Sequence, residues 1–137
     1  MKILAALLVC LVAGASQAAS IHAPAPLITG YYSNLVGSDD IEGLELKISR
    51  GHGVFRATLS YAEGGCGAAV SSVLIADQNR WRFDGVMRDG ATDNPVHIWL
   101  LAERGGLRVI PGPSTDWIAQ SPRGDLLYRV RKPICLK

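Results

Sequence analysis

The sequence predicts an all-β fold: a small antiparallel meander of about seven or eight short strands that closes into a barrel or a sandwich. Three observations support this class. Apolar and polar residues alternate with a period of two in several short segments, glycine-rich or polar turns separate these segments, and no segment keeps a helical period over several turns. We expect the strands to pair in sequence order, with closure of the sheet removing its exposed edges.

The clearest element is a β-hairpin formed by residues 44–49 and 55–61. Leucine or isoleucine occupies every second position of the first segment, and apolar or aromatic residues do so in the second, from Phe55 to Tyr61. The sequence Gly51-His52-Gly53 between them is typical of a tight turn. The alternation predicts that one face of this hairpin is buried.

The remaining strands are predicted from shorter apolar runs bounded by glycine, proline, asparagine or aspartate. They are residues 30–35, 70–75, 81–87, 96–102, 107–110 and 126–131. Residues 114–120 are the one candidate for a short helix, with Ser114 as its N-cap, and an irregular loop is the alternative for this segment.

The N-terminus has the three-part layout of a secretory signal peptide over residues 1–18. Lys2 supplies the positive start, residues 3–12 are apolar, and Ser16 and Ala18 fit the small-residue rule for cleavage after Ala18. This predicts a periplasmic or secreted protein. Residues 19–29, which include an Ala-Pro-Ala-Pro stretch, are expected to be a flexible segment. Residues 30–137 are expected to form a single β domain.

The cysteines predict one disulfide. Cys10 leaves with the signal peptide, so Cys66 and Cys135 remain as a pair in an oxidising compartment. Their bond would tie the glycine-rich turn near Cys66 to the C-terminal tail.

Composition and motifs exclude several classes of function. Loss of Lys2 with the signal lowers the formal net charge from +2 to about +1, which disfavours nucleic acid or anionic membranes as main partners. There is no G-x-S-x-G element and no cysteine–histidine spacing of a zinc site. The acidic run at residues 39–43 lacks the pattern of an EF-hand loop. We therefore predict no metal, no cofactor and no stable membrane insertion after removal of the signal.

The leading functional hypothesis is a non-enzymatic binding protein that holds or occludes a protein partner, as inhibitors and immunity proteins do. Candidate partner-binding residues are the charged or aromatic side chains of polar loops and turns: Asp39, Asp40, Glu42, His52 and Trp117.

Two alternatives remain open. The first is a carrier of a small hydrophobic ligand, with a barrel cavity lined by Phe55, Tyr61, His97 and Trp99. The second is an enzyme with dispersed residues such as His97 and Asp84, which would have to converge in one pocket.

The overall plan is similar to that of small exported bacterial β-barrels, such as lipocalin-like proteins and periplasmic lysozyme inhibitors. Gly30-Tyr31-Tyr32 lies where a lipocalin carries its G-x-W sequence, but the tryptophan is missing. The resemblance is therefore one of architecture, and it assigns no functional residue.

Overall fold

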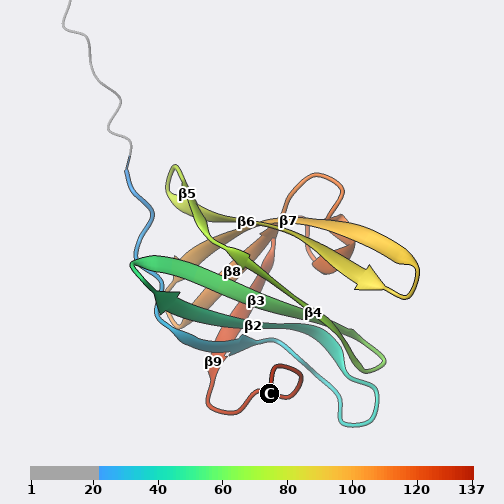
Figure 1. Cartoon of the computed structure of the whole chain (residues 1–137). Coiled ribbons are helices and arrows are strands. Elements are labelled where there is room, and N and C mark those ends of the chain that lie inside the picture. Colours follow the sequence, from blue (N-terminus) through green and yellow to red (C-terminus); the bar gives the residue numbers. More distant parts are fainter. Residues whose placement is uncertain (1–21) are drawn as a thin grey trace, which may run out of the picture.

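The protein is a nine-stranded antiparallel sheet curled into a nearly closed barrel, seen in a computed structural model that describes residues 22–137 (Figure 1). The predicted signal peptide, with Cys10, lies outside the described residues. The strands are β1 (Gly30–Ser33), β2 (Glu42–Gly51), β3 (Val54–Glu63), β4 (Cys66–Val73), β5 (Ile75–Asp77), β6 (Arg80–Asp89), β7 (Thr92–Glu103), β8 (Gly106–Pro111) and β9 (Asp125–Val130). The predicted all-β class, the antiparallel meander and its closure toward a barrel are confirmed.

The structure has nine strands rather than the predicted seven or eight. The single strand predicted at residues 70–75 is in fact parts of two strands, β4 and β5. The chain bends between β4 and β5 at Leu74, whose side chain is buried in the core. The Leu74 amide donates to the Phe55 carbonyl at 2.8 Å. Burial of this one side chain ends β4 and turns the chain into the short β5.

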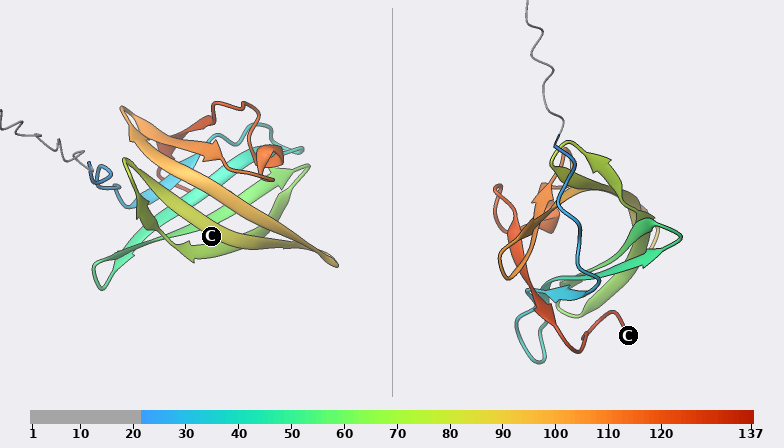
Figure 2. Two further views of the ribbon diagram at one scale, coloured as in Figure 1. Left: turned by 90° about the horizontal axis from the view of Figure 1, so that it is seen from above. Right: turned by 90° about the vertical axis from the view of Figure 1, so that its left-hand side faces the viewer.

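The strand order is β4-β3-β2-β1-β9-β8-β7-β6-β5, so β1 pairs with both β2 and β9. The sheet curls until β4 packs alongside β6, although no ladder joins these two strands. Viewed end-on, the strands form a ring (Figure 2, right). The barrel is therefore nearly closed, with one seam between β4 and β6.

The interior is filled by side chains. The inward positions of the long strands carry mostly leucine, isoleucine, valine and phenylalanine, as the period-two alternation predicts. The largest of these side chains are at most 2% exposed: Leu44, Leu46, Ile48, Leu59, Phe83, Val96, Ile98, Leu100, Leu107, Val109 and Leu127. Burial on this scale, rather than a hollow centre, stabilises the barrel.

The helix candidate is a single 3-10 turn, Asp116–Ile118. Ser114 is not its N-cap: Thr115 precedes the turn and makes no side-chain capping bond. The Thr115 hydroxyl is buried and instead accepts a hydrogen bond from the His97 amide at 2.9 Å. The structure therefore has a long-range hydrogen bond between Thr115 and β7 in place of the local N-cap that the sequence suggested.

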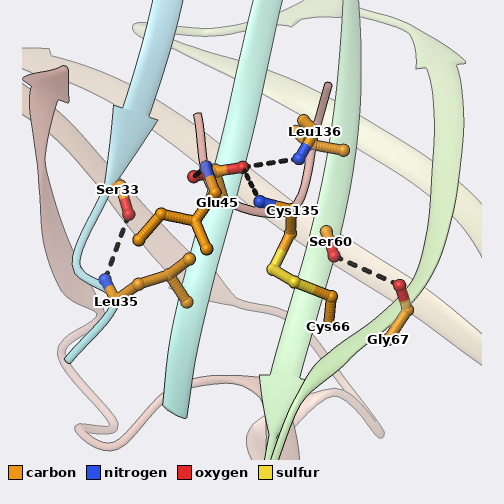
Figure 3. The surroundings of a disulfide bond; sticks show 9 residues. Ser33, Leu35, Glu45, Ser60, Cys66, Gly67, Cys135 and Leu136 are labelled. Carbon is orange, nitrogen blue, oxygen red and sulfur yellow. Dashed lines mark hydrogen bonds between the residues drawn. A yellow bond between two sulfur atoms is a disulfide. The ribbon is translucent and has the colours of Figure 1, made fainter. Parts of the chain in front are cut away.

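The predicted disulfide between Cys66 and Cys135 is present. It fastens the C-terminal tail to the outside of the barrel, over β2 and β3 (Figure 3). The Glu45 carboxylate, 0% exposed, accepts hydrogen bonds from the amides of Ile134, Cys135 and Leu136 at 2.7–2.8 Å. The tail is thus held by one covalent bond and by three main-chain donors on one buried carboxylate.

Residues 22–29 contain no regular secondary structure, but their last residues contact the barrel. The Trp81 indole donates to the Ala25 carbonyl at 2.9 Å, and the Tyr32 hydroxyl donates to the Ile28 carbonyl at 2.7 Å. Leu27 is buried in the core cluster. This segment therefore covers part of one end of the barrel.

Candidate functional site

The two ends of the barrel differ in the length of their connections. At one end, here called the loop end, lie the 34–41 loop, the β3–β4 and β6–β7 turns, and the long 112–124 connection. The β3–β4 and β6–β7 turns and the 34–41 loop are on the right in Figure 1. The opposite end carries short turns and the 22–29 segment. Long, irregular connections on a rigid scaffold are where binding residues usually lie.

An aromatic pair marks the loop end. Tyr61 lies near the end of β3, and Trp117 lies in the 3-10 turn. Their ring centroids are 5.5 Å apart at an interplanar angle of 83°, an edge-to-face contact. The Trp117 indole donates to the Ser114 carbonyl at 3.2 Å, and neighbouring Ile118 is buried. Trp117 is therefore fixed in position while 38% of it stays exposed.

Two hollows flank this pair. The larger has a volume of about 530 Å³ and the smaller about 250 Å³, and both are lined by Tyr61 and Trp117. The larger also contacts the first residues of β4 and the end of β6, including Met87. The smaller is bounded by Glu42 and by the residues that follow Trp117.

The charge around the pair is negative. Glu42 and Glu63 line the hollows, and Asp40 Oδ1 lies beside the β3–β4 turn at Gly64. Burial raises the pKa of the Tyr61 phenol, and the carboxylates of Glu63 and Glu42 raise it further. The loop end thus presents an aromatic surface with a carboxylate rim, which is electrostatically suited to a basic partner.

We expect the Tyr61 phenol to ionise above the ordinary tyrosine range of about 10. Because the folded state holds this proton more tightly than the unfolded state, stability should fall as the pH rises from about 10 through the folded pKa. Absorbance titration of phenolate formation measures the pKa of Tyr61 as the titration step that is present in the wild type and absent from Tyr61→Phe. Glu63→Gln should lower the midpoint of that step, whereas Glu103→Gln, at the opposite end of the barrel, should not. A Tyr61 step at or below about 10 would contradict the raised pKa.

Four of the five predicted partner-binding residues lie at the loop end. Glu42 lines the smaller hollow together with Trp117, and Asp39 and Asp40 are exposed in the 34–41 loop. His52 does not join them, because it lies in the β2–β3 turn at the opposite end of the barrel. The aromatic partner of Trp117 is Tyr61, which the alternation of β3 assigned to the interior.

The four residues proposed to line an internal cavity are not brought together. Phe55 is buried and packs edge-to-face on Trp81 at 5.2 Å, and Tyr61 lies at the loop end. His97 and Trp99 are on the outer face of β7, where the Trp99 indole donates to Asp77 at 2.9 Å. The inward positions of β7 are Val96, Ile98 and Leu100, so the predicted cavity does not form from these side chains.

His97 and Asp84 do meet, on the outer face of β6 and β7. His97 Nδ1 and Asp84 Oδ1 are 2.7 Å apart, and Arg82 Nε donates to the other carboxylate oxygen at 2.8 Å. The hydrogen bond with His97 and the guanidinium of Arg82 lower the pKa of Asp84. The pair is about half exposed and lines neither hollow, and within residues 22–137 no hydroxyl or thiol is hydrogen-bonded to the His97 ring.

Within residues 22–137, no group of three or more histidine, cysteine, aspartate or glutamate side chains is arranged to hold a metal ion. A membrane-crossing helix is likewise absent from the described part of the chain.

The fold and the candidate site together define a small, nearly closed antiparallel β-barrel with an acidic, aromatic loop end. Comparison with protein-family models, with curated proteins and with solved structures finds no match for this chain.

Proposed function

We propose that this chain is an exported, non-enzymatic binding protein that holds or occludes a basic protein partner with its loop end. The observation that carries the proposal is the exposed, immobilised Trp117 beside Tyr61, set within a rim of carboxylates. Tryptophan and tyrosine at the centre of a rigid surface are the residues that most often dominate protein–protein affinity. The carboxylate rim would steer and orient a positively charged partner.

The filled interior supports a protein partner over an enclosed small ligand. A carrier of the lipocalin type needs space between its strands, whereas the central side chains here are at most 2% exposed. If the protein were a carrier, its small ligand would have to bind in the open hollow of about 530 Å³ at the loop end. Native mass spectrometry of the purified protein distinguishes the two, because a carrier should retain a small molecule.

Trp117→Ala should weaken partner binding by at least about tenfold, because truncation of an anchoring tryptophan commonly costs more than 2 kcal/mol of binding energy. The measurement is capture of basic proteins from periplasmic and secreted fractions by the immobilised mature protein, followed by titration of the captured protein. Tyr128→Ala is the matched control, since Tyr128 is 59% exposed but lies on β9, away from both hollows.

A partner retained equally by wild type and Trp117→Ala would place the binding surface elsewhere. Recovery of no protein at concentrations well above micromolar would count against the binding hypothesis itself.

A further inference from the structure

The seam between β4 and β6 leaves strand edges unpaired. β4 is the last strand on its side of the sheet, and its ladder runs to β3 alone. β6 pairs with β5 only through Arg80–Arg82, so from Phe83 to Asp89 its ladder runs to β7 alone. Two runs of main-chain donors and acceptors therefore face each other without a ladder between them.

The seam is tight at its centre and opens toward the loop end. At the centre, a Cβ added to Gly85 of β6 would lie only 2.8 Å from Val70 Cγ2 of β4, so the glycine lets the two strands approach. Beyond this contact the larger hollow separates Cys66–Ala68 of β4 from Met87–Asp89 of β6. The hollow is therefore a wedge between two free strand edges.

The edge of β4 lacks the charged and proline residues that often protect a free strand, and a register shift in its ladder with β3 leaves Gly67 and Ala68 without paired residues on β3. Its sequence, CGAAVSSV, contains no charged residue and no proline, and Gly67, Ala68, Ala69 and Ser71 are exposed. Natural edge strands are usually shielded by lysine, proline or a covering segment. A strand edge without charge or proline, beside a preformed hollow, is a site to which an extended peptide can add as a further strand.

The charges around the wedge select the kind of segment that would enter. Glu63 and Asp89 line it, and within residues 22–137 neither has a salt-bridge partner. The positive charge of Arg88 is compensated by Asp93 at 2.9 Å. A second copy of this chain would bring the same carboxylates against this rim, so like charges would oppose that pairing.

We propose that an extended segment of a basic partner protein enters this wedge and adds as a strand to the free edge of β4. The inference rests on the proposed function and names its mode of contact. Main-chain hydrogen bonds to β4 would supply affinity, and lysine or arginine side chains near Glu63 and Asp89 would supply selectivity. Trp117 and Tyr61 line the same hollow and would pack against the entering segment.

The probe is a synthetic capped peptide of about five alternating lysine and valine residues, a short strand that suits the few residues of β4 that the wedge leaves open. It should bind the mature protein and slow amide hydrogen exchange in Cys66–Ala69. The same peptide N-methylated at alternate residues keeps the side chains but loses main-chain donors, and it should bind at least about tenfold more weakly. A peptide with glutamate in place of lysine should not bind.

Two protein variants locate the site. Ala68 lines the wedge and is exposed, so Ala68→Lys should weaken binding of the lysine–valine peptide, whereas Ala68→Glu should preserve or strengthen it. Ala76→Lys is the matched control, because Ala76 is exposed on β5 at the other end of the strand order and does not line the wedge.

Strand addition is overturned if the lysine–valine peptide does not bind, or if N-methylation leaves its affinity unchanged. It is also overturned if Ala68→Lys and Ala76→Lys have equal effects. These outcomes can be distinguished from failure of the proposed function. If a partner loses affinity for Trp117→Ala but binds Ala68→Lys as well as it binds the wild type, the proposed function stands and strand addition to β4 is refuted.

Discussion

Replacing Glu45 by alanine should lower the free energy of unfolding by about 3 kcal/mol, because three main-chain donors of the tail would lose their acceptor. Glu45 is completely buried beneath the C-terminal tail, so water cannot replace the carboxylate without displacing that tail. Urea unfolding, followed by tryptophan fluorescence, measures the change from the transition midpoint and slope.

Glu103→Ala is the matched control for this change. Glu103 accepts from Arg108 through both carboxylate oxygens, but its side chain is 30% exposed, so water can solvate Arg108 when the carboxylate is removed and the effect should be smaller. Glu45→Gln should fall between the two, because one side-chain oxygen remains to accept from the tail. Equal stabilities of Glu45→Ala and Glu103→Ala would show that the buried carboxylate does not hold the tail.

Replacing both Cys66 and Cys135 by serine should destabilise the fold by about 4 kcal/mol on the chain-entropy model, since the bond closes a loop across 69 positions. Both cysteines are changed together so that no free thiol remains. Urea unfolding of the double variant, and of the wild type with and without a reductant, should show the same loss.

The Glu45 substitution and the removal of the disulfide both loosen the C-terminal tail, so their effects on the free energy of unfolding should not be additive. Glu45 accepts from the amide of Cys135 itself, and loss of either anchor loosens the segment that the other one holds. We expect the variant that combines all three substitutions to lose less stability than the sum of the separate losses. Strict additivity would mean that the disulfide and the carboxylate stabilise the tail independently.

Much of the fold could be predicted because the period of two is a property of each strand alone. The hairpin of β2 and β3 and its turn at His52 follow from local alternation and turn residues. Consecutive strands pair with each other in every case except β4 and β5, and the first and last strands, β1 and β9, also pair with each other. The split between β4 and β5 could not be predicted, because it depends on where the Leu74 side chain is buried among distant strands.

The positions of the candidate site residues were predicted in part, for a related reason. Trp117 stands out in one polar connection and the acidic residues in and beside another, and both connections lie at the same end of the barrel. His97 and Trp99 were misassigned because β7 is apolar on both faces, and alternation does not say which face turns inward. The burial of Glu45 could not be predicted from the sequence, since an outward-facing glutamate in a strand is usually exposed to water and is rarely covered by the C-terminal tail.

The sequence by itself determined the strand periodicity, the identity of the disulfide pair and the aromatic and acidic character of the loops. The strand periodicity and the character of the loops depend on short-range sequence patterns, and the disulfide pair depends on the number of cysteines. Only the tertiary structure decided which strand edges stay unpaired, that Tyr61 meets Trp117, and that Glu45 is buried by the tail. The unpaired edges depend on how the sheet closes, and the other two features are contacts between segments distant in the chain, so no local preference decides any of them.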